Sequence, residues 1–132
     1  MTFDDDDDPS SATTCAMLLV SGDHIDGDEF TYLFGVIPTE VQKAGDCTGW
    51  RLSSESHLKS TNAERHILWI LDQIAGKEDV VSHLKRERKC QVDIGCWWQG
   101  RPDIDEVGPF LTPGTLRRIA GFDLNLTMYF KR

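Results

Sequence analysis

The segment from residue 13 to residue 20 constrains the fold more than any other part of the chain. Thr13–Val20 is apolar on both faces of an extended strand: Cys15, Met17 and Leu19 on one face, Ala16, Leu18 and Val20 on the other. A strand with one solvated face would alternate apolar and polar residues, so this pattern predicts a strand covered on both sides. The chain therefore has to build a sheet around Thr13–Val20.

The remaining elements follow from capping signals and periodicity. Asp26 with Glu29 three residues later predicts the start of a helix, and Gly35 its end. Thr112 followed by Pro113 predicts another helix start. The full set of expected elements is a helix over 26–35, a strand over 47–53, helices over 61–76 and 78–88, a strand over 90–96, a helix over 112–121 and a strand over 124–130.

The order strand, helix, strand thus occurs twice, with a helical pair between the two halves. It predicts an α+β fold, a ferredoxin-like sandwich of two split β-α-β halves, with a mainly antiparallel sheet of about four strands and helices on one face. A chain of 132 residues with 39% apolar content fits one domain, expected over residues 12–132. The aspartate run Asp4–Asp8 repels itself and predicts a disordered acidic tail over residues 1–11.

Charge and composition exclude several classes of protein. The net charge is −8, and the one basic cluster, Lys85–Lys89, is short and interrupted by an acid, so no nucleic acid partner is expected. The longest apolar run, Ala16–Val20, is too short to span a bilayer, so no membrane partner is expected. The four cysteines form no C-x-x-C pair and no leader precedes them, which predicts reduced thiols and a cytoplasmic protein.

Signals for chemistry are weak. The histidines lack the spacing of a zinc site, and no glycine-rich phosphate loop is present, so neither a metal nor a cofactor is expected. The segment Ser53–His57 offers hydroxyls, a carboxylate and an imidazole, but a local polar loop does not provide the base and oxyanion donor that nucleophilic catalysis needs. No catalytic residue is assigned, so the sequence favours a non-enzyme and leaves an enzyme as the alternative.

Binding residues are predicted on the strand that contains Trp97. Adjacent Trp97 and Trp98 must face opposite sides, and Trp97 falls on the face of Gln91, Asp93 and Gly95. An indole there suits a contact surface, although the Gln99–Pro109 loop could instead fold over it. Trp50 is expected to line the same face. Asp93 conflicts with a central strand unless one sheet face is wet or covered by a partner.

The motifs resemble a known bacterial family. They are Ser21-Gly22-Asp23, Leu33-Phe34-Gly35, Pro38-Thr39, Gly45-Asp46, Gly49-Trp50-Arg51-Leu52-Ser53, the helix around His66 to Leu71, and Tyr129-Phe130. Over nearly all of the range 15–130 the chain is similar to the uncharacterised domain of unknown function 4279. Ala44 stands where that family usually has a basic residue before Gly-Asp. The resemblance implies a small cytoplasmic bacterial domain and no activity.

Two function classes remain open. The first is a non-enzymatic protein-binding module, immunity-type or regulatory, that associates with another protein, such as a basic bacterial toxin, or with itself as a homodimer. The second is a small enzyme or ligand-binding domain that uses the loop over residues 38–50. Its pocket would be formed by Lys43, Asp46, Trp50 and Arg51.

Overall fold

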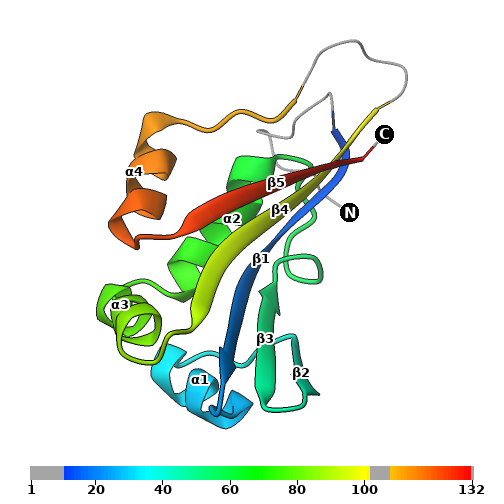
Figure 1. Cartoon of the computed structure of the whole chain (residues 1–132). Helices are drawn as coiled ribbons and strands as arrows, with labels where there is room; N and C mark the ends of the chain where they lie inside the picture. Colours follow the sequence, from blue (N-terminus) through cyan, green and yellow to red (C-terminus); the bar gives the residue numbers. More distant parts are fainter. Residues whose placement is uncertain (1–10, 102–107, 132) are drawn as a thin grey trace.

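The computed structural model of the chain describes residues 11–101 and 108–131. The predicted acidic tail lies outside these residues except for Ser11, which is buried and begins the first strand. Five strands form one mixed sheet in the order β2-β3-β1-β4-β5 (Figure 1). Their bounds are β1 Ser11–Asp23, β2 Glu40–Ala44, β3 Cys47–Ser53, β4 Gln91–Gly100 and β5 Asn125–Lys131.

The central position predicted for the first strand is confirmed. β1 pairs antiparallel with β3 on one side and with β4 on the other. β2 extends the sheet antiparallel to β3, and β5 extends it parallel to β4. The fold is therefore α+β with a largely antiparallel sheet.

The sheet differs from the predicted ferredoxin-like sandwich in strand number and connection. In the second predicted half β5 pairs directly with β4, so no strand lies between them. In the first half the strand that follows the first helix is β2, which runs parallel to β1 with β3 between them, because both pair antiparallel with β3. β3, the strand predicted for that half, runs antiparallel to β1. The cause is the additional strand β2, which forms a hairpin with β3 and reverses the chain. Gly45 has a φ of 63°, and its position first in a two-residue turn with Asp46 is typical of a type II′ hairpin turn.

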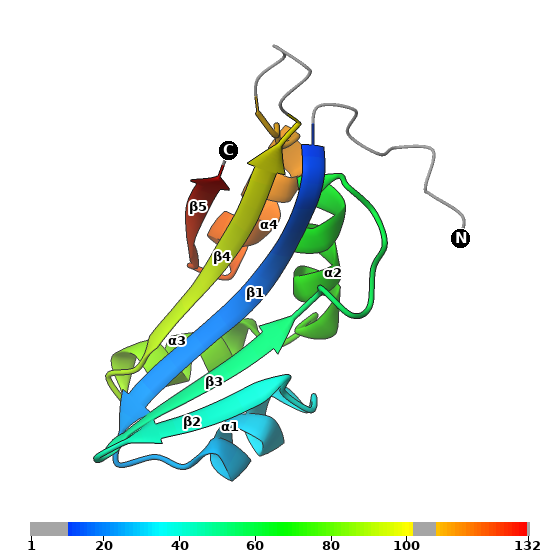
Figure 2. The same cartoon turned by 90° about the vertical axis from the view of Figure 1, so that its right-hand side faces the viewer.

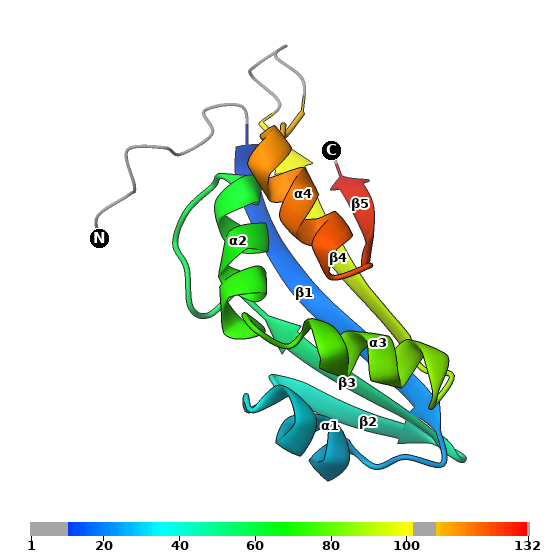
Figure 3. The same cartoon turned by 90° about the vertical axis from the view of Figure 1, so that its left-hand side faces the viewer.

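The described residues contain four helices, which all pack on the same face of the sheet (Figures 2 and 3). They are α1 Gly27–Phe34, α2 Ala63–Gln73, α3 Glu78–Arg86 and α4 Pro113–Gly121. Asp26 caps α1 by accepting a hydrogen bond from the Glu29 amide at 3.0 Å, and Gly35 ends it with a φ of 72°. α2 is capped by Asn62, whose side chain accepts a hydrogen bond from the Glu64 amide at 2.9 Å.

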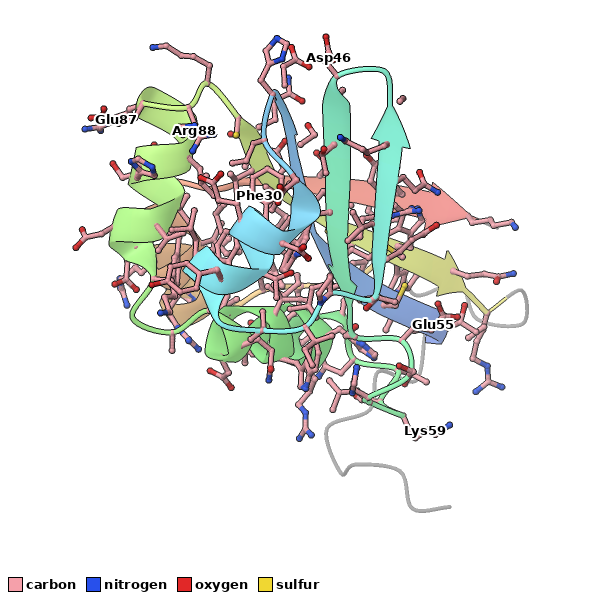
Figure 4. The ribbon with its side chains drawn as sticks, turned by 90° about the horizontal axis from the view of Figure 1, so that it is seen from below. Phe30, Asp46, Glu55, Lys59, Glu87 and Arg88 are labelled. Carbon is pink, nitrogen blue, oxygen red and sulfur yellow. The ribbon has the colours of Figure 1, made fainter. Side chains whose placement is uncertain are left out.

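The hydrophobic core lies between the sheet and these helices. Ala16, Leu18 and Val20 of β1 are buried there, as is Phe30, which points from α1 into the interior (Figure 4). Cys15, Met17 and Leu19 lie on the opposite face and are only partly buried. The expectation that β1 is covered on both sides is therefore wrong, because its second apolar face has no helix over it. None of the helices among the described residues is both long enough and apolar enough to cross a bilayer.

Candidate binding surface

The sheet face without helices gathers residues from four strands, and we call it the uncovered face. Strand alternation and register place side chains of β1 beside those of β3 and β4, and side chains of β4 beside those of β5. The uncovered face comprises Cys15, Met17, Leu19, Arg51, Gln91, Asp93, Gly95, Trp97, Asn125, Thr127 and Tyr129.

Trp97 of β4 stacks on Tyr129 of β5 on the uncovered face. The ring centroids are 4.6 Å apart and the rings are inclined by 12°. The indole also lies over Gly95, since a Cβ atom at that position would be 2.9 Å from two ring carbons. Gly95 is thus required for this packing. Trp97 is half-buried and Tyr129 is 43% exposed, so the pair presents an ordered aromatic surface to solvent.

Asp93 occupies the central part of the sheet without being buried in the core. Its carboxylate accepts a hydrogen bond from the Asn125 side-chain amide at 3.2 Å. Because the uncovered face is open to water, the charge does not have to be desolvated. Gln91 is exposed at the start of the same strand.

Arg51 also lies on the uncovered face, where it forms an ion pair with Glu40 of β2. Gly49 of β3, the strand between β1 and β2, has no side chain. A hollow of about 320 Å³ lies at this position. The hollow is lined by Leu19, Val20, Ser21, Gln42, Gly49, Trp50, Arg51, Gln91 and Asp93. Arg51 of β3 and the β4 residues Gln91 and Asp93 thus line the same hollow.

Trp50 is buried in the core and does not belong to the uncovered face, so the expectation that it lines that face is wrong. It is 0% exposed and stacks on Phe34 of α1 with centroids 5.3 Å apart. Its indole N–H donates to the Thr31 hydroxyl at 3.0 Å. The alternation of β3 places Trp50 on the helix-covered face, opposite to Arg51.

The four residues predicted to form a pocket in the 38–50 segment do not come together. Residues 40–44 and 47–53 are strands of a hairpin, so neighbouring side chains point to opposite faces. Lys43 points away from the face of Arg51, and Asp46 lies in the exposed turn at the hairpin tip (Figure 4). Lys43, Asp46, Trp50 and Arg51 therefore do not converge. In the sequence, the Gly45-Asp46 dipeptide is the signal that indicates this hairpin turn.

A larger hollow of about 650 Å³ lies at the end of the sheet, beside the loop that follows β3. Figure 4 shows Glu55 and Lys59 on this loop, at the end opposite to Asp46. Sequence patterns did not reveal it because its residues come from four separate segments. It is lined by Ala12, Thr13, Thr14, Cys15, Glu55, Leu58, Lys59, Ser60, Thr61, Trp97, Trp98, Gln99, Tyr129, Phe130 and Lys131.

All four cysteines are free, as the sequence predicts. Those whose pKa is raised are poor nucleophiles. Burial raises the pKa of Cys15, which lines the larger hollow, and the nearby Glu55 carboxylate raises it further. Burial also raises the pKa of Cys96 to about 11. Since the thiolate is the reactive form, neither residue is set up for nucleophilic catalysis.

A serine and a histidine do form a hydrogen bond, but it is enclosed in the core. The Ser54 hydroxyl is 2.6 Å from His66 Nδ1, and His66 Nε2 is 2.7 Å from the Ser60 carbonyl oxygen. A carbonyl only accepts, so Nε2 carries the hydrogen and Nδ1 accepts from Ser54. Ser54 is 0% exposed and His66 1% exposed, which excludes a substrate from this pair in the folded domain.

The acid-dense segment before α1 has structural roles. Asp26 caps α1, and Glu29 forms an ion pair with Arg88, which lies near the end of α3 (Figure 4). Within residues 11–101 and 108–131, no three His, Cys, Asp or Glu side chains are grouped closely enough to hold a metal ion.

Comparison with known families identifies the chain. It matches the domain of unknown function DUF4279 over residues 11–131. The chain belongs to this family. The match covers nearly the whole chain and includes every strand and helix described above. No curated protein and no solved structure matches it.

Proposed function

We propose that this DUF4279 domain is a non-enzymatic protein-binding module, immunity-type or regulatory, and that the uncovered face is its contact surface. The observation that carries the proposal is the stacked pair of Trp97 and Tyr129 on a sheet face without helices. Aromatic residues held in a fixed geometry bind with a small entropic cost and are enriched among interface anchors.

Charge supports a basic partner. The chain carries a net charge of −8, and such an excess attracts proteins of opposite charge and speeds their encounter. A basic bacterial toxin met in the cytoplasm is one partner of this kind. The acidic excess steers the encounter, while the aromatic pair supplies the local contact.

The test compares two tyrosines, one on the uncovered face and one outside it. Tyr129 lies on the uncovered face, whereas Tyr32 lies on α1 and is 84% exposed. Proteins captured by the wild-type chain from the native host are identified, and the purified partner is titrated with each variant. Tyr129→Ala is expected to weaken binding at least about tenfold, as loss of an interface anchor does. Tyr32→Ala is expected to bind like the wild type. Equal affinities for the wild type and Tyr129→Ala contradict the proposal.

A second candidate function is the binding of a small ligand in the larger hollow. Its volume of about 650 Å³ falls within the range of ligand sites, and its lining includes Trp97, Trp98, Tyr129 and Phe130. The lining carries two positive charges, Lys59 and Lys131, against one negative charge, Glu55. An aromatic anion is therefore the favoured class of ligand. Titration with anilinonaphthalene sulfonate, followed by tryptophan fluorescence, tests it. Saturable binding that Lys131→Gln weakens supports this function, and the absence of saturation excludes this ligand class.

A further inference from the structure

Among residues 11–101 and 108–131, no strand pairs with the outer edge of β5. β5 pairs with β4 on one side only. Within the described part of the chain, no other backbone hydrogen bond involves residues 125–131. In both side views β5 lies at the margin of the molecule with no element beyond it (Figures 2 and 3). The edge therefore offers free N–H and C=O groups to another strand.

The two edges of the sheet differ in how they are protected. Proteins usually guard an exposed edge with charged residues, proline or a bulge. β2, the other edge, carries Glu40 and Lys43 within its five residues. β5 has the uncharged run Asn125–Phe130, with Leu126, Met128, Tyr129 and Phe130 among its six residues and a charge only at Lys131. β5 is thus the edge that favours pairing.

The flank of α4 extends the apolar surface beside this edge. Arg118 of α4 forms an ion pair with Asp72 of α2 at 3.0 Å, which fixes the side of α4 that faces α2. At 100° per residue, Leu116 and Ala120 lie about 160° around the helix from Arg118, on the side away from α2. Leu116 is 50% exposed, and on β5 Phe130 is 60% exposed. Apolar side chains therefore accompany the free edge on the helix side of the sheet.

The charges at the ends of β5 suit a second copy of the same strand. Asp123 precedes β5 and forms an ion pair with Lys85 at 3.1 Å, yet its side chain is 74% exposed and can meet a second cation, and Lys131 ends β5. In an antiparallel pair centred on Thr127, Lys131 of each copy lies opposite Asp123 of the other. A twofold axis makes this contact self-complementary and uses both free edges.

We propose that a second copy of this chain pairs with the outer edge of β5, antiparallel and about a twofold axis at Thr127. The two five-stranded sheets then form one continuous sheet, with the α4 helices of both copies side by side. A strand pair alone is smaller than a stable interface of roughly 1,200–2,000 Å², and the α4 flank and Phe130 supply further area. This dimer leaves the uncovered face open, so it is separate from the proposed partner contact.

Charge exchange at the twofold axis tests the dimer. The mass of the chain is measured by sedimentation equilibrium over a concentration series, and twice 14.9 kDa is expected. Thr127→Lys and Thr127→Glu are each expected to weaken dimerisation at least tenfold, because the like charges meet their own copies at the axis. An equimolar mixture of the two variants is expected to dimerise again. A wild-type chain that remains monomeric throughout the series overturns the proposal.

Two further variants serve as controls. Gln42→Lys places the same charge on the edge strand β2 and is expected to leave the dimer intact. Leu116→Asn tests the α4 flank and is expected to weaken the dimer, whereas Ile37→Asn changes an apolar residue that is 84% exposed near α1 and is expected to have no effect. A dimer that resists both Thr127 variants, or that Gln42→Lys breaks, uses another surface and contradicts the inference. Since Tyr129→Ala is scored on partner binding, a monomeric result leaves the proposed function untouched.

Discussion

Burial decides the chemistry of Cys96. This thiol is fully buried on the helix side of β4, and burial raises its pKa from the ordinary value of 9.0 to about 11. A hydrogen bond with the Thr14 hydroxyl, at 3.8 Å, opposes the shift without cancelling it. The folded domain therefore holds the proton more tightly than the unfolded chain does.

This difference predicts a loss of stability at high pH. The contribution of Cys96 is complete below pH 9 and is lost as the pH rises from 9 to about 11, because only the unfolded chain ionises in that range. The loss amounts to roughly 3 kcal/mol by the linkage between pKa and free energy. The measurement is the free energy of unfolding in urea at pH 8 and above pH 10. Cys96→Ala is expected to lose less stability between these values than the wild type, and an equal loss in both proteins contradicts the assignment.

At the scale of secondary structure elements, the buried Ser54–His66 pair joins β1, the loop after β3 and α2. The Ser54 amide donates to the Ala16 carbonyl oxygen and its hydroxyl accepts from the Ala16 amide, both at 2.9 Å. His66 of α2 then links Ser54 to the Ser60 carbonyl. These bonds take the place of strand pairing where β3 has ended.

Removing the imidazole should destabilise the domain. His66→Phe keeps an aromatic ring but removes both ring hydrogen bonds, and the buried Ser54 hydroxyl loses its acceptor. The expected cost is about 2–4 kcal/mol, from one to two lost buried hydrogen bonds. The check is urea unfolding, with His57→Phe as the matched control, since His57 is exposed and stacks on Trp69. A cost below about 1 kcal/mol for His66→Phe would show that these bonds contribute little.

The molecule as a whole is asymmetric, with all four helices on one side of the sheet and a half-buried apolar row on the other. Among the described residues, every buried apolar side chain lies between Ala16 and Leu124. The segment before Ser11 holds five consecutive aspartates, Asp4–Asp8, which have no apolar side chain to bury.

Truncation before Ser11 is therefore expected to leave the melting temperature within experimental error. Thermal unfolding of the full and truncated chains, followed by circular dichroism, checks this. A fall of several degrees would show that the aspartate segment packs on the domain. If stability is unchanged and only partner binding at low salt weakens, the segment acts as an electrostatic steering element.

The sequence by itself indicated every described element except β2, and the central place of one strand. Capping at Asp26, the stop at Gly35 and the two apolar faces of Thr13–Val20 are local signals, so they indicated α1 and β1 without any knowledge of pairing. The shared face of Gln91, Asp93 and Trp97 also followed from alternation alone. β2 was missed because its exposed polar residues resemble a loop, although Gly45-Asp46 marked the turn.

Only the tertiary structure decided which residues meet. Trp50 and Arg51 are neighbours in the chain, yet the hairpin sends one into the core under α1 and the other to the uncovered face. Tyr129 reaches Trp97 because β5 pairs parallel with β4, and no local pattern specifies that register. Periodicity is a property of short segments, whereas pairing depends on contacts between residues far apart in the chain. For this reason the sequence predicted which face of β4 carries Trp97, whereas only the fold brought Tyr129 beside it and left the outer edge of β5 unpaired within the described residues.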